Sequence, residues 1–106
     1  MSDNQRYKEY NQHILLQKLC KKKIRKLNNV LTSLQKNLKK NKINLKLLHL
    51  KEKEPLSGNL DLDVHFRHHI TKTKKELIKK IQNIQVKIRK YKKKLIYYKD
   101  SLHELD

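Results

Sequence analysis

The chain has 106 residues, including one Gly and one Pro, and its 28 basic and 10 acidic residues give a formal net charge of +18. This length allows one domain at most, and so few turn residues exclude a β-sandwich, a barrel and a nucleotide-binding α/β fold with glycine-rich loops. The composition therefore predicts an all-α protein with long helices, and the charge predicts an attraction to polyanions.

The first predicted helix covers about residues 4–53. Apolar side chains recur along it at alternating spacings of four and three residues, the heptad pattern of a helix that packs lengthwise on another helix. We call this stripe the N-terminal seam: Cys20, Ile24, Leu27, Leu31, Leu34, Leu38, Asn41, Leu45 and Leu48. Asn41 is its one polar member. Glu54-Pro55 is expected to end the helix, because the residue before a proline resists the helical conformation.

A structured linker at the tip is predicted for about residues 54–72, with Gly58 as a turn residue. Apolar residues alternate with polar ones here, a strand-like period of two over a stretch too short to form a sheet alone. The alternating apolar residues are Leu60, Leu62, Val64 and Phe66. We expect the linker to fold back over apolar side chains outside the seams near the tip, namely Ile43, Leu47, Leu50 and Ile78.

The second predicted helix covers about residues 73–104. The residues "TKKE" are typical of a capping box, with Thr73 as the cap and Glu76 reaching back to it. Alternatively, Thr73 lies inside a helix that begins as early as Asp63. The heptad pattern of this helix is the C-terminal seam: Leu77, Ile81, Ile84, Ile88, Tyr91, Leu95, Tyr98, Leu102 and Leu105.

The two seams match in length, with nine positions each, and can be laid antiparallel from Leu48 beside Leu77 to Cys20 beside Leu105. The sequence therefore predicts a single domain over residues 1–106, a long antiparallel helical hairpin with a two-stranded coiled-coil-like shaft. The alternative is a homodimer in which each seam packs against its own copy, but the matched lengths favour the hairpin. The start of the first helix then extends beyond the second, and its Ile14, Leu15, Leu16 and Leu19 need cover. We expect them to dock on a neighbouring protein; the alternative is that this segment frays or folds onto the shaft.

The charges are distributed unevenly along the chain. Residues 10–51 contain twelve Lys or Arg and no acid, and residues 72–99 contain twelve basic residues with Glu76 as the only acid. The other acids lie at the predicted tip and at the far end of the hairpin. The ion pairs that usually flank a coiled-coil seam cannot form along such a shaft, so an external polyanion is expected to balance the lysines.

Structured RNA is the predicted partner, and rRNA is favoured over DNA. No helix-turn-helix, zinc finger or basic zipper is present. With 24 Lys among the 28 basic residues, the chain is suited to positioning phosphates rather than reading bases. Such a protein would hold folded RNA by shape in a ribonucleoprotein, and small basic hairpins between rRNA helices offer an architectural analogy in the ribosome. Phosphate contacts are predicted for Lys21, Lys22, Lys23, Arg25, Lys26, Lys39, Lys40, Lys79, Lys80, Arg89, Lys90, Lys92, Lys93 and Lys94.

Two other functions fit parts of the pattern. A coiled-coil subunit of a chromatin or cytoskeletal assembly could place its cations on DNA or acidic protein. A basic amphipathic helix could lie on an anionic membrane, but the apolar stripes of the two helices are already expected to pack against each other. We expect an intracellular protein that is not secreted, since the N-terminal residues lack an apolar signal core and the single cysteine allows no intrachain disulfide.

Candidate chemistry is sparse. His65 and His69 would share a helical face at a spacing that can bind zinc, with His68 nearby, but no third ligand follows at a recognisable spacing. Cys20 lies in a seam and is expected to be a small buried side chain rather than a nucleophile. Tyr97 lies outside the seam and could stack on a base, although a structural role is preferred. The sequence therefore predicts no enzyme, no metal site and no cofactor.

Overall fold

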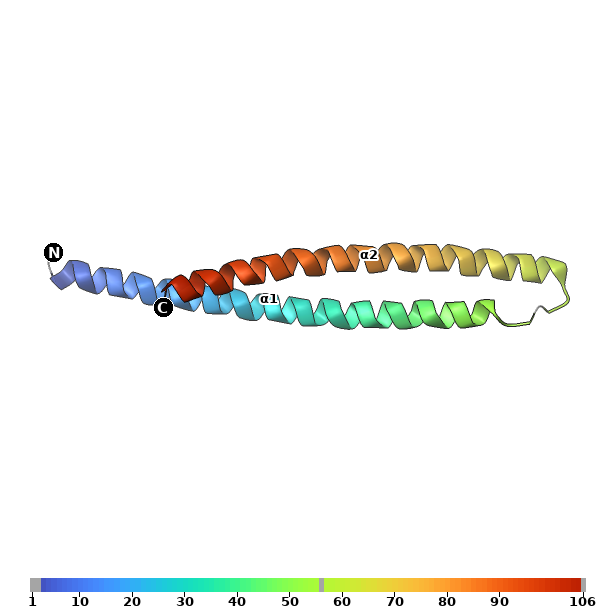
Figure 1. The fold of residues 1–106 in the computed structure, drawn as a ribbon, viewed down its shortest axis with the longest axis horizontal. Helices are drawn as coiled ribbons and strands as arrows, with labels where there is room; N and C mark the ends of the chain where they lie inside the picture. The colour runs from blue at the N-terminus through green and yellow to red at the C-terminus, as the bar shows by residue number, and fades with distance from the viewer. Residues whose placement is uncertain (1–2, 56, 106) are drawn as a thin grey trace. The chain divides into compact units, whose positions relative to one another are not determined.

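The protein is an all-α antiparallel helical hairpin. The structure, a computed structural model, describes residues 3–55 and 57–105. Two helices, α1 (Asp3–Glu52) and α2 (Leu60–Leu105), account for nearly all of these residues, and the described part of the chain contains no strand (Figure 1). The predicted fold class is therefore confirmed, and α1 has nearly the bounds that the sequence predicted.

Contacts divide the hairpin into two compact units. The terminal unit combines Met1–Ser33 with Ile88–Asp106, and the tip unit consists of Leu34–Lys87. Within each unit, a segment of α1 lies beside a segment of α2 that runs in the opposite direction.

The core of each unit consists mainly of seam residues. All eighteen predicted seam positions are buried or half-buried, and from residue 18 to residue 50 they are the only positions of α1 that are not exposed. The buried members are Leu27, Leu31 and Ile88 in the terminal unit, and Asn41, Ile81 and Ile84 in the tip unit. The heptad spacing in the sequence therefore predicted correctly which face of each helix is packed.

Within the tip unit, the heptad pattern continues beyond the predicted seams. Ile70 lies seven residues before Leu77 on α2, and only 1% of its surface is exposed. Lys74 lies between these two residues, and Glu52 follows Leu48 on α1 at the same heptad spacing. Lys74 Nζ lies 2.8 Å from Glu52 Oε2. An ion pair thus extends the apolar seam towards the tip.

The predicted tip linker is wrong for most of its length, because α2 begins at Leu60 rather than near residue 73. Asn59 caps the helix: its Oδ1 accepts a hydrogen bond from the Leu62 N–H at 3.3 Å. The Ser57 N–H and hydroxyl donate to Asp63 Oδ1 at 3.0 and 2.8 Å, which ties the connection to the first turn. Gly58 supplies the turn with a φ of 84°. The backbone of residues 60–66 therefore follows a helix rather than an extended strand, and the chain here has no need of a strand partner.

The predicted capping box at Thr73 is also wrong. Thr73 lies inside α2, and its hydroxyl donates to the His69 carbonyl oxygen at 2.8 Å. This bond to the preceding turn is a common arrangement for a threonine in a helix interior. The alternative prediction, an earlier start with Thr73 inside the helix, is closer to the structure.

The predicted cover over the apolar residues near the tip does not form. All four of these residues, Ile43, Leu47, Leu50 and Ile78, remain between 42% and 56% exposed. The segment expected to cover them belongs to α2, and its Leu60 and Leu62 are themselves exposed. Leu47, Leu50 and Leu77 line part of an open groove of about 580 Å³ within the tip unit. Because α2 begins at Leu60, most of the segment that was expected to fold back is part of a helix.

Asn41 is the buried polar member of the seam. Only 7% of its surface is exposed, and its Nδ2 donates to the Asn37 carbonyl oxygen of the preceding turn at 2.8 Å. This hydrogen bond is local to α1, so it satisfies the amide without linking the two helices. A polar residue at one seam position commonly lowers stability while restricting the register of packing.

Replacing Asn41 with Leu is expected to raise the free energy of unfolding by about 1 kcal/mol, because an apolar side chain would fill the seam in place of an amide. Urea denaturation followed by circular dichroism measures this change. Asn37→Leu is the matched control, since Asn37 is exposed, and it should shift stability by less than about 0.5 kcal/mol. A loss of stability in Asn41→Leu would show that the amide contributes more than its local bond.

Candidate nucleic-acid interface

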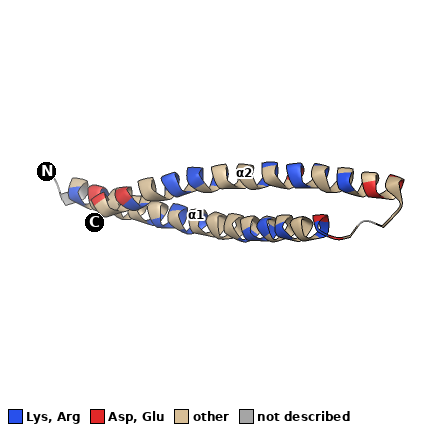
Figure 2. Cartoon of the chain, turned by 45° about the vertical axis from the view of Figure 1, so that its right-hand side comes forward, with Lys and Arg blue, Asp and Glu red and all other residues tan. Residues whose placement is uncertain are grey.

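All fourteen side chains predicted to contact phosphate are exposed. Ten lie in the terminal unit: Lys21, Lys22, Lys23, Arg25 and Lys26 on α1, and Arg89, Lys90, Lys92, Lys93 and Lys94 on α2. Four lie in the tip unit: Lys39 and Lys40 on α1, and Lys79 and Lys80 on α2. Figure 2 shows Lys and Arg on both helices, with acidic residues near the helix ends. The fold therefore leaves these cations accessible to a partner.

Few basic side chains among the described residues have an anionic neighbour within the chain. Among the described residues, the basic side chains within 4.0 Å of a carboxylate are Lys74 and His49, and both contact Glu52. None of the fourteen predicted residues forms an ion pair in that part of the chain. Lys94 has an aromatic neighbour instead, with its Nζ 5.5 Å from the centre of the Tyr91 ring. The positive charge of both helices is thus available for an external anion.

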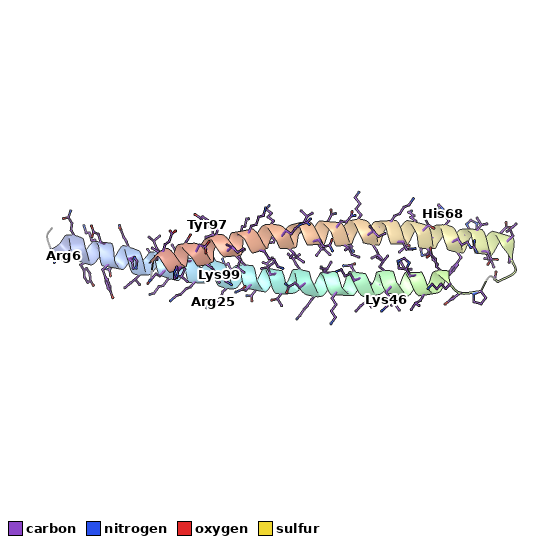
Figure 3. All side chains as sticks on the ribbon, in the orientation of Figure 1. Arg6, Arg25, Lys46, His68, Tyr97 and Lys99 are labelled. Carbon is purple, nitrogen blue, oxygen red and sulfur yellow. The ribbon has the colours of Figure 1, made fainter. Side chains whose placement is uncertain are left out.

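A concentrated basic surface lies on α1 in the terminal unit. Positions three and four residues apart share one side of a helix, and here they carry cations on the side opposite Ile24 and Leu27 of the seam. We call this surface the α1 basic face, and it consists of Lys18, Lys21, Lys22, Arg25 and Lys26. Together with Asn29, these residues line a groove of about 600 Å³. Figure 3 places the labelled Arg25 on the side of α1 away from α2. Lys18 was not among the predicted residues, although its spacing from Lys22 would have identified it.

A second basic surface lies on α2 in the same unit. Arg89, Lys90 and Lys93 are exposed on the side opposite Ile88 and Tyr91 of the seam, and we call them the α2 basic face. Lys92 and Lys94 lie closer to the seam on its two flanks, as their helical spacing requires. Further along α2, the residues on this outward side are acidic rather than basic. Asp100 and Glu104 lie seven and eleven residues after Lys93 on the same side of the helix.

Cations in the tip unit are interleaved with other residue types. On α1, Lys39, Lys42 and Lys46 share a shallow groove of about 360 Å³ with Leu38 and Ile43. Lys42 and Lys46 were also missing from the predicted set. On α2, a second groove of about 380 Å³ is lined by Thr73, Glu76, Leu77, Lys79, Lys80 and Asn83. These grooves are less purely basic than the α1 basic face.

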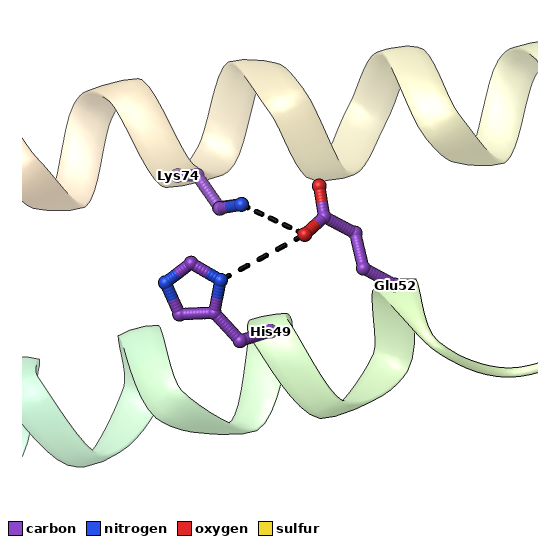
Figure 4. Close-up of polar contacts among 3 residues, drawn as sticks. All are labelled: His49, Glu52 and Lys74. Atoms are coloured by element: carbon purple, nitrogen blue, oxygen red, sulfur yellow. Dashed lines mark hydrogen bonds and ion pairs between the residues drawn. The ribbon is translucent and has the colours of Figure 1, made fainter.

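Two acids near the tip, Glu52 and Asp63, have local hydrogen-bond partners. Lys74 donates to Glu52 Oε2, and His49 Nδ1 lies 3.7 Å from the same oxygen (Figure 4). The hydrogen bond from Lys74 is the main cause of a lowered pKa at Glu52. Hydrogen bonds from the Ser57 backbone and side chain likewise lower the pKa of Asp63. A lowered carboxyl pKa stabilises the fold above the carboxyl's unfolded pKa, and this contribution is lost as the pH falls through the lower folded value. Since Glu52 is exposed and Asp63 is only half-buried, solvent screening keeps these effects small.

The other residues singled out in the sequence remain separate. Tyr97 is 67% exposed, packs edge to face on Tyr98 at 5.3 Å between ring centres, and lies on the side of α2 away from α1 (Figure 3). His65, His68 and His69 are exposed residues of α2 rather than of a loop. Within the described residues, no group of three potential metal ligands comes together. No described helix combines the length and apolar character needed to cross a membrane.

Helix α1 continues past the end of α2 in the terminal unit. Gln17 Nε2 donates to the Leu105 carbonyl oxygen at 3.4 Å, so Gln17 lies beside the last turn of α2. Around this point Leu15, Leu16 and Leu19 are 49% to 58% exposed, while Ile14 is half-buried. The predicted docking segment is thus largely uncovered by the chain's own described residues, and its role in docking stays a prediction.

Comparison with protein-family models, with curated proteins and with solved structures found no match to this chain.

Proposed function

We propose that the protein is a non-catalytic structural component of a ribonucleoprotein, such as a ribosome, and that it binds the phosphate backbone of structured RNA. The observation that supports this most is the exposure of all fourteen predicted phosphate contacts, none of which pairs with a carboxylate in the described chain. Lysines that cover both helices without acidic neighbours favour a polyanionic partner through counterion release.

RNA suits this surface better than an operator site on DNA. A sequence reader needs side chains that enter a groove and pair with base edges, and arginine is the commonest such side chain. The chain has only four Arg among its 28 basic residues, and the α1 basic face contains one of them, Arg25. Lysines spread along two long helices instead favour recognition of a folded backbone by shape.

Affinity for structured RNA should fall steeply with salt. If about five phosphates are contacted, a plot of log affinity against log salt should have a slope near −4, measured by fluorescence anisotropy with a labelled hairpin RNA. Changing four side chains of the α1 basic face (K18Q/K21Q/K22Q/R25Q) should reduce the steepness of the slope by about two, because fewer cations remain to contact phosphate. A flat plot would eliminate phosphate binding as the function.

A matched control separates the proposed contacts from the effect of net charge. K8Q/K51Q/K53Q/K72Q removes the same number of positive charges, and these lysines lie outside the predicted set. We expect this control to change the slope by less than about one. Equal effects of the two variants would mean that RNA senses only the total charge.

The second candidate function is a coiled-coil subunit of a multiprotein assembly that uses its basic surface on DNA or acidic protein. It is favoured by the exposure of Leu15, Leu16 and Leu19 around the point where α1 passes the end of α2. Co-purification separates the two candidates: a protein partner retained after complete nuclease digestion supports the assembly subunit, whereas association lost on digestion supports the ribonucleoprotein.

A further inference from the structure

We propose that the terminal unit bridges two separate double-helical RNA segments, one bound by the α1 basic face and the other by the α2 basic face. This inference rests on the proposed function and makes it more specific, because the protein would hold two RNA helices side by side rather than bind one. It follows from the way the hairpin distributes its cations within the terminal unit.

The two basic faces point in opposite directions. Each lies on the side of its helix opposite the seam, and the seams of α1 and α2 face each other in the core of the unit. The thickness of two packed helices therefore separates the faces, roughly 20 Å from helices that are each about 10–12 Å in diameter. A phosphate bound by Arg25 is thus far from a phosphate bound by Lys93.

A single short duplex cannot reach both faces. Double-stranded nucleic acid is stiff, with a persistence length of about 150 base pairs for DNA, so a duplex of about 16 base pairs behaves as a straight rod. To contact the second face, that rod would have to bend around the hairpin. Two duplexes on opposite sides avoid this bending, and each neutralises cations that the other cannot reach.

The acids of α2 set the relative positions of the two duplexes. Asp100 and Glu104 continue the outward side of α2 beyond Lys93, and they repel phosphate from its last turns. The contact between Gln17 and Leu105 places the α1 basic face beside these same turns. The duplex on α2 is therefore displaced from the duplex on α1 by about ten residues of helix, or roughly 15 Å.

A capture experiment tests this arrangement. An unlabelled duplex of about 16 base pairs is immobilised, the protein is added, and retention of a second, fluorescent duplex is measured. The wild-type protein should retain the second duplex, and sedimentation with excess RNA should show two duplexes per chain. The α1-face variant K18Q/K21Q/K22Q/R25Q and the α2-face variant R89Q/K90Q/K93Q should each still bind one duplex, while retention of the second falls about tenfold or more.

Two controls make the result specific. K8Q/K51Q/K53Q/K72Q, which keeps both basic faces intact, should retain the second duplex. An equimolar mixture of the two face variants should not restore retention, because bridging needs both faces on one chain. Restoration by the mixture would overturn the proposal in favour of bridging between associated chains.

Other outcomes would also overturn it. Saturation of the wild-type protein at one duplex per chain refutes bridging while leaving RNA binding intact. Retention unaffected by either face variant shows that the two faces are not the sites. Failure of the wild-type protein to bind any RNA refutes both bridging and the proposed function.

Discussion

Replacing Ile84 with Ala is expected to lower the free energy of unfolding by about 2–4 kcal/mol. Ile84 is a seam residue of α2 in the tip unit, and 8% of its surface is exposed. Removing its methyl and methylene groups loses apolar burial and leaves a cavity that the surrounding side chains fill only in part. The core consists of one seam on each helix, so this loss is a large fraction of the few kcal/mol that such a small core provides.

Leu31→Ala should have a comparable effect in the terminal unit, because Leu31 is a seam residue with 6% of its surface exposed. Val86→Ala is the control for the effect of truncating an apolar side chain, since Val86 lies two residues from Ile84 but is 54% exposed. It should change stability by less than about 0.5 kcal/mol. Urea denaturation at moderate salt measures all three variants. Similar losses in Val86→Ala and Ile84→Ala would contradict the assignment of the seam as the core.

The seams could be predicted from sequence because heptad spacing is a local property that also determines the packed face. Every seam position from Cys20 to Leu48 is buried or half-buried, including the polar Asn41. The ion pair of Glu52 and Lys74 was not predicted, because the seams were defined by the spacing of mainly apolar side chains and both of these side chains are charged. Ile70 lies at a heptad position of α2, seven residues before Leu77, and is buried. Its spacing would have indicated that the helix begins before residue 73.

The start of α2 was mispredicted because two local signals competed. The alternation of apolar and polar residues from Leu60 to Phe66 suggested an extended segment. In the structure these apolar side chains are exposed on a helix, so their spacing does not correspond to a buried face. Asn59 followed by acids in the first helical turn is a strong start signal, since an Asn cap and nearby carboxylates both favour a helix N-terminus. The signal at Asn59, rather than the capping-box pattern at Thr73, corresponds to the start of α2.

The candidate interface could be predicted as a set of residue types but less well as a surface. Acid-free stretches identify exposed lysines from the sequence alone. Which lysines share a groove depends on helical phase relative to the seam, and this is why Lys18 joins the α1 basic face although it was not predicted. The opposition of the two basic faces also required the packed arrangement of the helices in the terminal unit.

Structured RNA is expected to raise the melting temperature of the protein by about 10–20 °C at low salt. The chain carries a net charge of +18, and the basic side chains of α1 and α2 repel one another across the seams. A ligand that binds only the folded state, at one hundred times its dissociation constant, stabilises that state by about 2.7 kcal/mol. For a chain of this size, each kcal/mol corresponds to about 4–8 °C. Thermal melts followed by circular dichroism, with and without a saturating hairpin RNA, measure the shift.

Salt should act in opposite directions on the free and the RNA-bound protein. Raising the salt to about 1 M shortens the screening length to about 3 Å, which weakens repulsion between the helices and stabilises the free protein. The same salt weakens RNA binding, so the added stability from RNA should disappear and the two melting curves should converge. A free protein that loses stability as salt rises would show that attractive ion pairs, rather than repulsion between uncompensated lysines, dominate the electrostatics of the hairpin. Since the described residues include only one carboxylate paired with basic groups, Glu52, we expect repulsion to dominate and RNA phosphate to relieve it.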